Sequence, residues 1–224
     1  MRMRRKKHLD ERLDACLDVM IDYEIEYYNP TLFNKNRACF SCEEVFKNSN
    51  PVHVEIGCGK GEFVVESAKR NPSVNYIAVE KLKNVIVDAA EKVVSSGVEN
   101  IRLINCPAEH LKGYFPDGSV SRLYLNFSCP YPKKSYAKHR LTHKSFLEIY
   151  KSFLEKDGEI HIKTDNSGLF EFSLNSLSDF GFTLKNITFD LHKSDFVGNI
   201  VTEYEKKFTD AGFPIFRTEA YFRK

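Results

Sequence analysis

The fold is indicated most clearly by ten residues, Val54-Glu55-Ile56-Gly57-Cys58-Gly59-Lys60-Gly61-Glu62-Phe63. An apolar run ends here in a turn with glycines at three alternate positions, and a helix-like stretch follows at about 61–70. Glycines let a backbone turn sharply and approach a ligand closely, while the start of the following helix offers free N–H groups. The stretch therefore predicts a strand, a ligand-binding turn and a helix.

Two kinds of cofactor bind at such turns, and Glu62 distinguishes them. A dinucleotide site needs Gly-x-Gly-x-x-Gly, which would require glycine at position 62, and a carboxylate is a poor neighbour for a pyrophosphate. Glu55 precedes the turn and suits a ligand that ends in an ammonium group and carries no phosphate. We therefore expect S-adenosylmethionine, while an ordinary tight turn between strand and helix remains an alternative explanation of the glycines.

From residue 51 onward, short apolar runs alternate with helix-like stretches. The predicted strands are Val52–Ile56, Tyr76–Glu80, Ile101–Asn105, Arg122–Phe127, Glu159–Thr164, Phe182–Asp190 and Ile215–Phe222. The predicted helices cover about 61–70, 82–96, 108–113, 139–156, 166–178 and 200–211. This alternation implies right-handed parallel crossovers. We predict an α/β fold with a mostly parallel, seven-stranded, Rossmann-like sheet that binds ligands at the carboxyl ends of its strands.

The composition fits a globular chain. It has 224 residues, 42% of them hydrophobic and 29% charged, and no apolar run approaches the roughly 20 residues of a membrane span. The basic start lacks the apolar segment of a secretory signal, and six irregularly spaced cysteines fit a reducing compartment, so we expect a cytoplasmic protein. We expect one domain over 51–224, with a basic extension over 1–50 that packs on it through a helix within 9–28.

Two basic segments stand out against a mildly acidic remainder. Residues 2–7 and 133–144 each carry five lysines or arginines and no acid, whereas elsewhere acidic residues outnumber basic ones by 31 to 23. Either segment alone could be a solvated surface. Together they favour nucleic acid as a partner, because clustered Lys and Arg neutralise phosphates. Cys39 and Cys42 have no second pair at zinc-ribbon spacing, so we predict no metal site.

Further polar residues follow the other predicted strands. Glu80 lies 19 residues after Gly61, the approximate separation at which nucleotide folds place an acid on ribose hydroxyls. The fourth strand runs into a loop that two prolines make rigid, and lysines follow it directly. Asp165 ends the fifth strand, where it could either cap the next helix or face a ligand.

Four motifs together resemble the bacterial tRNA (guanine-N7-)-methyltransferase family. They are Gly57-Cys58-Gly59-Lys60-Gly61, Asn126-Phe127-Ser128-x-Pro130-x-Pro132-Lys133-Lys134, Lys163-Thr164-Asp165-Asn166 and Thr202-Glu203-Tyr204-Glu205-x-Lys207-Phe208. The resemblance covers essentially the whole chain. It implies a class I S-adenosylmethionine-dependent methyltransferase fold and methyl transfer to N7 of a guanine in the variable loop of tRNA. Residues 51–224 would then form the methyltransferase domain.

The resemblance also implies roles for particular residues. Cofactor binding is implied for Glu55, Gly57, Gly59, Gly61, Glu80, Pro107 and Cys129, and substrate tRNA for Lys133, Asp165, Thr202, Glu203, Tyr204 and Glu205. Contact with RNA is implied for the run Lys134, Ser135, Tyr136, Ala137, Lys138, His139 and Arg140. The sequence indicates no membrane and no obligate protein partner, and it leaves monomer and homodimer open.

Two positions depart from the family pattern. Cys129 stands where the family has an aspartate that acts as a catalytic or cofactor-contacting acid, and Tyr131 replaces a tryptophan. Pro107 stands where the family commonly has another aspartate, with Glu109 as a possible substitute. These departures motivate an alternative: a tRNA-binding paralogue with weak or lost transfer. A dinucleotide-dependent oxidoreductase is a third possibility, which Glu62 disfavours.

Overall fold

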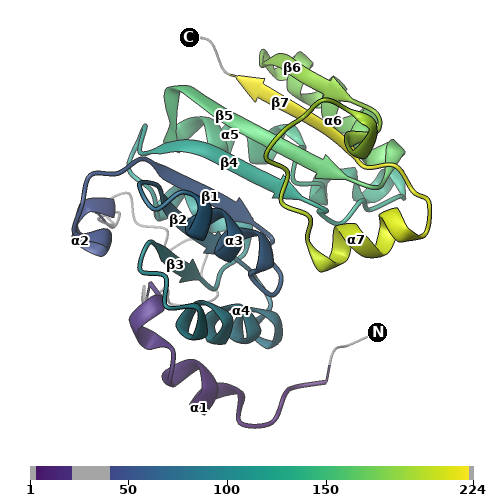
Figure 1. The fold of residues 1–224 in the computed structure, drawn as a ribbon. Helices are drawn as coiled ribbons and strands as arrows, with labels where there is room; N and C mark the ends of the chain where they lie inside the picture. Colours follow the sequence, from purple (N-terminus) through teal and green to yellow (C-terminus); the bar gives the residue numbers. More distant parts are fainter. Residues whose placement is uncertain (1–3, 22–40, 222–224) are drawn as a thin grey trace.

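A computed structural model describes residues 4–21 and 41–221 (Figure 1). The strands are β1 Val52–Ile56, β2 Asn75–Val79, β3 Ile101–Ile104, β4 Val120–Asn126, β5 Leu154–Thr164, β6 Thr183–Thr188 and β7 Phe216–Tyr221. The α-helices are α1 Leu9–Asp14, α2 Cys42–Phe46, α3 Glu62–Arg70, α4 Lys83–Ser96, α5 Lys144–Phe153, α6 Ser167–Phe180 and α7 Glu203–Asp210. Short 3-10 helices are η1 Leu17–Val19, η3 Ala108–Gly113, η4 Lys134–His139 and η5 Leu191–Lys193.

The strands form one seven-stranded sheet in the order β3-β2-β1-β4-β5-β7-β6. Every neighbouring pair from β3 to β5 is parallel, and β7 runs antiparallel between β5 and β6. The order reverses between β1 and β4, so the carboxyl ends of these strands form the topological switch point where ligands bind in open α/β sheets. The predicted mostly parallel, Rossmann-like sheet is confirmed.

Two apolar clusters cover the two faces of the sheet. Side chains of α3 and α4 pack with those of α1 on one face, and side chains of α5, η3 and α6 pack on the other. In Figure 1, α1 lies beneath α4 at the far end from β6 and β7. The isolated bridge between Met20 and Leu103 brings the chain from α1 beside the edge strand β3.

Some element boundaries differ from the sequence prediction. The helix expected over 139–156 is instead η4 followed by α5, and β5 begins directly at Leu154. The helix expected within 9–28 is present as α1 and η1, and the rest of that range lies beyond Ile21, outside the described residues. Cys39 also lies outside them, whereas Cys42 begins α2.

Residues 4–21 and 41–221 contain neither a candidate membrane span nor a metal-binding cluster. Within these ranges, each helix is too short or too polar to cross a membrane. In the same residues no group of three or more His, Cys, Asp or Glu side chains is arranged to hold a metal ion.

Candidate active site

The glycine turn after β1 has the backbone geometry of a ligand cradle. Gly57 and Gly59 have φ values of +82° and +56°, which side-chain-bearing residues rarely adopt, and no atom lies within 4 Å of where a Cβ would stand on either. The N–H groups of Gly57 and Cys58 donate to the Val79 carbonyl oxygen, at 2.8 and 3.1 Å, and so fix the turn to the end of β2. The turn therefore leaves open space for a ligand close to its backbone.

Gly61 serves a different purpose, which is the packing of α3 on α4. A Cβ at Gly61 would stand 3.1 Å from the Cβ of Ala89. The glycine therefore lets α3 begin close to α4, at the start of the helix whose N–H groups face the turn.

Glu55 is a buried carboxylate at the end of β1 with one oxygen left unpaired. Its Oε1 accepts a hydrogen bond of 3.0 Å from the Asn126 amide, while its Oε2 is buried without a partner. Burial raises the pKa of Glu55 to about 7, against the lowering effects of the Asn126 hydrogen bond and the positive charge of Lys163. An unpaired buried acceptor costs free energy, and none of the described protein residues supplies a donor to this oxygen.

A cavity of about 320 Å³ opens beside this turn, and we call it the cofactor cavity. It is lined by Ile56, Gly57, Val79, Glu80, Lys81, Leu82, Cys106, Ala108, Glu109, Phe127, Ser128, Cys129, Tyr131, His139, Leu141 and Phe146. The lining thus comes from the loops that follow β1, β2, β3 and β4, together with the segment from η4 to α5.

Glu80 faces the cofactor cavity at the end of β2. Its Oε1 accepts a hydrogen bond of 2.9 Å from the Leu82 N–H, and the Asn105 amide donates to its backbone oxygen at 2.8 Å. The loop geometry thus holds the carboxylate in place at the cavity wall. Among the residues after β3, Cys106, Ala108 and Glu109 line the cavity, whereas Pro107 lies between them as the N-cap of η3 and does not.

The loop after β4 forms the opposite wall and is held in an unusual conformation. Phe127 and Tyr131 have positive φ values of +50° and +42°, which is costly for residues with side chains. Arg140 stabilises this loop, because its guanidinium donates to the carbonyl oxygens of Pro130 and Tyr131, each at 3.0 Å, and lies over the Phe172 ring. The family resemblance implies RNA contact for Arg140, which stays a prediction, and in this structure the Arg140 side chain stabilises the loop.

Asp165 and Cys129 both lie near Tyr204, and Cys129 also lines the cofactor cavity. Burial raises the pKa of the Tyr204 hydroxyl, and the proximity of Asp165 and Cys129 adds to this effect. The Tyr204 ring packs on Phe127 with 4.9 Å between ring centroids. Asp165 does not cap α6, since Asn166 does so by accepting a 2.8 Å hydrogen bond from the Leu169 N–H. The structure thereby excludes the capping interpretation of Asp165.

The segment Thr202 to Glu205 has mixed surroundings. Thr202 caps α7, because its hydroxyl accepts from the Glu205 N–H at 3.2 Å, and the Glu203 N–H donates to the Glu62 carboxylate. The Tyr204 side chain is about half exposed. The Glu205 carboxylate is fully buried and bonded to Lys163 at 2.7 Å, and its contact with tRNA stays a prediction.

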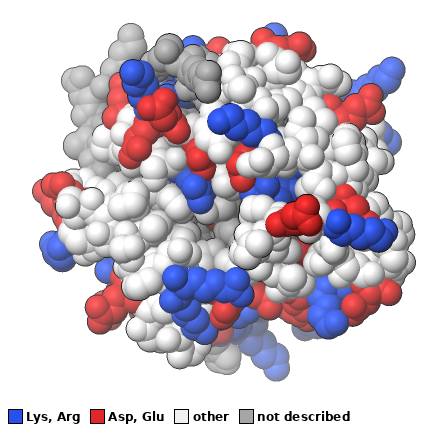
Figure 2. Space-filling model, turned by 45° about the horizontal axis from the view of Figure 1, so that its top comes forward, with Lys and Arg blue, Asp and Glu red and all other residues white. Residues whose placement is uncertain are grey.

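The run from Lys133 to His139 lies on the surface next to the cavity wall. Lys133, Lys134 and Lys138 are exposed, and Ser135, Tyr136 and Ala137 lie with them in or beside η4. Tyr136 and Tyr131 both contact the His139 ring, which also lines the cofactor cavity. On the face shown in Figure 2, basic and acidic side chains are interspersed, so no single-sign field covers it.

Lys163 begins the motif Lys163-Thr164-Asp165-Asn166, but the sequence predicted no role for its side chain. Its amine is buried in β5 and bonded to the oxygens of Asn199, Ile200 and Glu205. Lys163 lies on the same strand face as His161 and two residues before Asp165. This position could have predicted its role, because a cation on a buried strand face requires a buried partner.

Solved structures support the fold. The chain resembles the 16S rRNA methyltransferase KamB with a TM-score of 0.60 and 15% identity, over 81% of this chain and 92% of that one. It resembles an antibiotic-related methyltransferase with a TM-score of 0.58 and 17% identity, over 80% and 89% of the two chains. At these identities the likeness shows a class I methyltransferase fold.

Sequence comparisons give the family. Residues 49–218 match a family model described as "Putative methyltransferase". A tRNA (guanine-N(7)-)-methyltransferase from Bacillus cytotoxicus is 46% identical over 223 residues, which cover 100% of this chain and 98% of that protein. The chain therefore belongs to the tRNA (guanine-N7-)-methyltransferase family.

Proposed function

We propose that this protein transfers a methyl group from S-adenosylmethionine to N7 of a guanine in tRNA, and that it acts in the cytoplasm. The observation that carries the proposal is the buried Glu55 carboxyl group, which has one unpaired oxygen and stands two residues before a glycine turn with open space at Gly57 and Gly59. Bound S-adenosylmethionine supplies an electrophilic methyl group on a sulfonium. These two acceptors fit the cofactor, because Glu55 can accept from its ammonium group and Glu80 from its two ribose hydroxyls.

Guanine N7 sets simple requirements for the protein. N7 carries an in-plane lone pair and no proton, so the protein needs no base to create the nucleophile. Its task is to position the guanine, and aligned reactants account for about 7–11 kcal/mol of barrier in favourable cases. Asp165 is suited to this task, since a carboxylate accepts from the N1–H and N2–H groups of guanine, and Tyr204 and Cys129 lie close to it.

The exposed lysines of the 133–144 segment are suited to hold the phosphates of tRNA. Because phosphate contacts release counterions, replacing Lys133, Lys134 and Lys138 with alanine should reduce the slope of log affinity against log salt by about 2 to 3. Filter binding of tRNA across a salt series measures this slope. A matched variant replaces Lys112, Lys151 and Lys156, near the amino ends of β4 and β5, and should leave it unchanged. Equal slopes for both triple variants would remove the 133–144 segment from the RNA interface.

Substitutions at Cys129 test whether a negative charge at this position speeds methyl transfer. Attack by N7 leaves a cationic purine, and the family aspartate would stabilise this charge where Cys129 now stands at the cavity wall. Cys129→Asp should therefore raise the single-turnover transfer rate by about tenfold, and Cys129→Ser should lower it. Quench-flow measurement of methyl transfer at saturating cofactor compares the variants. Equal rates for all three proteins would make Cys129 a spectator, and Glu109, on the same cavity, would be the next residue to replace.

Mass-spectrometric nucleoside analysis tests the proposed function itself. Undermethylated tRNA incubated with the protein and S-adenosylmethionine should gain 7-methylguanosine and no other new methylated nucleoside. If the tRNA binds without gaining any methyl group, the alternative of a tRNA-binding paralogue is correct. A different methylated nucleoside would place the transfer elsewhere than N7.

A further inference from the structure

Helix α7 is held to the sheet by a buried ion pair, whereas most surface helices pack through an apolar face. Glu205 is the only buried residue among the eight of α7, with a side chain that is 0% exposed. Its Oε2 accepts from the Lys163 amine at 2.7 Å, and its Oε1 accepts from His192 and Asn199 at 2.9 and 2.6 Å. Replacing a buried ion pair by apolar residues is often neutral or stabilising, so the pair is poorly explained by stability alone.

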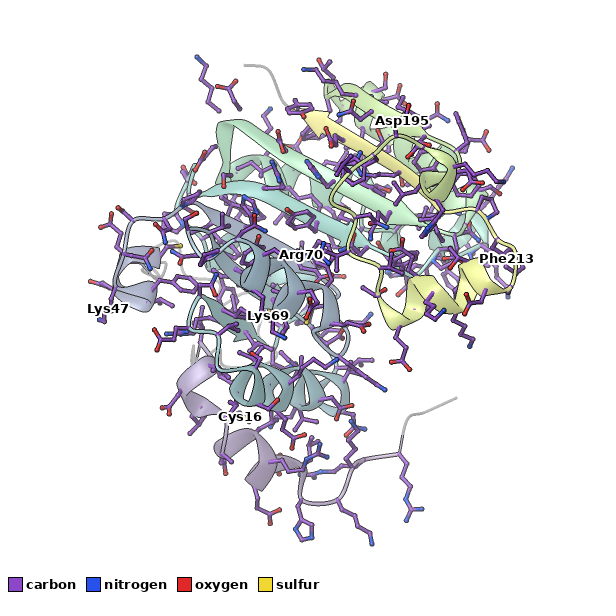
Figure 3. The ribbon with its side chains drawn as sticks, in the orientation of Figure 1. Cys16, Lys47, Lys69, Arg70, Asp195 and Phe213 are labelled. Atoms are coloured by element: carbon purple, nitrogen blue, oxygen red, sulfur yellow. The ribbon has the colours of Figure 1, made fainter. Side chains whose placement is uncertain are left out.

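Lys163 uses every donor of its amine on this anchor. Besides Glu205, the amine donates to the Asn199 side chain and to the Ile200 backbone oxygen, each at 3.0 Å. These two residues lie in the segment before α7, so one side chain of β5 holds both the helix and the segment that leads into it. Figure 3 shows Arg70 at the end of α3, and its guanidinium donates to the backbone oxygen of Asn199 at 3.4 Å.

Lys163 also lies next to the cofactor side of the sheet. It is the direct register partner of Asn126 on β4, and the Asn126 amide bonds Glu55 on β1. The backbone oxygen of Lys163 accepts from the Phe127 N–H at 2.7 Å, and its amine lies 5.7 Å from the centre of the Phe127 ring. Glu55, Asn126 and Lys163 therefore form a row across three neighbouring strands, with Glu205 at its end.

We propose that Lys163 is a positioning residue that links the tRNA-facing helix α7 to the cofactor acid Glu55, through the buried row of Glu55, Asn126, Lys163 and Glu205. This inference rests on the proposed function, since it takes Glu55 as the acceptor of the cofactor ammonium group. Lys163 then does two things at once. Its charge favours the ionised form of Glu55. Its hydrogen bonds fix α7, which places Tyr204 against Phe127 of the cavity lining.

Several other titratable groups influence the pKa values of Glu55 and Lys163. The pKa of Glu55 is raised first by burial and also by Glu80, and the charge of Lys163 opposes this. The pKa of Lys163 is lowered first by burial, and Glu205 and Glu55 act against that lowering while Arg217 adds to it. Cys58 from the glycine turn and Tyr124 from β4 complete the titratable surroundings of Glu55. Among these groups, Lys163 is the cation that lowers the pKa of Glu55.

The test measures binding of S-adenosylhomocysteine by calorimetry between pH 5.5 and 8.5, and binding of tRNA by a filter assay. In the wild-type protein, affinity for S-adenosylhomocysteine should rise with pH as Glu55 ionises. Lys163→Met should move the midpoint of this rise to higher pH and weaken tRNA binding about tenfold. Glu205→Gln should weaken tRNA binding similarly without any upward shift of the midpoint, because the Lys163 charge remains. General loosening of the fold would affect both variants alike, so an upward shift of the midpoint in Lys163→Met alone identifies a positioning role.

Controls separate this outcome from misfolding. Lys206→Met removes an exposed cation from α7 and should leave the midpoint unchanged. If Lys163→Met does not fold, the double variant Lys163→Met/Glu205→Gln, which leaves no unpaired buried charge, should still show the upward midpoint. An unmoved midpoint in the variants that lack Lys163, or unchanged tRNA affinity in both single variants, overturns the proposal. Both readouts are binding measurements, so a protein that transfers no methyl group to N7 would refute the proposed function without deciding this test.

Discussion

Replacing Glu55 with glutamine should lower the affinity for S-adenosylhomocysteine by about 10- to 100-fold while stabilising the free protein. The loss follows because one charge-assisted hydrogen bond, from the ammonium group to the unpaired Oε2, contributes roughly 1.5–3 kcal/mol. Glutamine keeps the shape of the side chain and an oxygen that accepts from Asn126. Calorimetric titration with S-adenosylhomocysteine at pH 8 measures the loss.

The gain in stability follows from the sign of the pKa shift. Burial raises the pKa of Glu55 from an ordinary 4.5 to about 7, so the folded protein holds this proton more tightly than the unfolded chain. The carboxyl group therefore destabilises the fold increasingly as the pH rises from about 4.5 to about 7, by about 3 kcal/mol in total. Thermal unfolding of Glu55→Gln should show this gain at pH 8 and little gain at pH 4.

The control for both measurements is Glu66→Gln, which removes a partly exposed carboxylate that pairs with Lys69 on α3. It should change neither the affinity nor the unfolding temperature appreciably, because exposed ion pairs contribute little. If Glu55→Gln binds S-adenosylhomocysteine as tightly as the wild type, Glu55 does not hold the ammonium group.

Replacing Asp165 with alanine should reduce kcat/KM for tRNA by about 100-fold or more. The reason is that two charge-assisted hydrogen bonds to the guanine edge would be lost, at roughly 1.5–3 kcal/mol each. Steady-state kinetics with tRNA at saturating cofactor give this ratio. A matched control is Asn166→Asp, which adds a charge next to the site and preserves the cap of α6, since aspartate caps as well as asparagine.

A substrate change distinguishes direct contact from an indirect effect of Asp165. Inosine lacks the N2 amino group, so tRNA with inosine at the target position should react about tenfold more slowly than guanine with the wild-type protein. With Asp165→Ala the two substrates should react alike, because the acceptor is already absent. If the variant still prefers guanine as strongly as the wild type, another group recognises N2.

Local sequence patterns predicted the elements that position the site. The three glycines and Glu55 are adjacent in the chain, and the period-2 and helical patterns follow from backbone geometry, so the turn and the sheet could be derived. Glu62 was the local residue that argued against a pyrophosphate. Its own partner, the Glu203 N–H, lies 141 residues away and had no local signal.

The features that the sequence did not predict all depend on tertiary partners. Asp165 and Asn166 are equally good capping residues, and only the backbone path at the end of β5 assigns the cap to Asn166. In the sequence, Arg140 is one more cation in a basic run. Its structural role depends on the loop after β4, which folds back and places two carbonyl oxygens next to its guanidinium. From the sequence, Glu205 is expected to be a surface acid of an amphipathic helix. Its burial depends on the contact with Lys163 of β5, which is distant in the sequence.

The central claim, direct attack by guanine N7, is tested most directly by removing that atom. Transcription with 7-deazaguanosine triphosphate gives tRNA in which a C–H group replaces N7, while the N1–H and N2–H donors remain. Single-turnover methyl transfer to this tRNA and its binding in a filter assay should be compared with unmodified tRNA. The account predicts affinities within a few-fold of each other and no transfer to the deaza-substituted tRNA above background. Methyl transfer to the deaza-substituted tRNA at a rate like that of unmodified tRNA would contradict it.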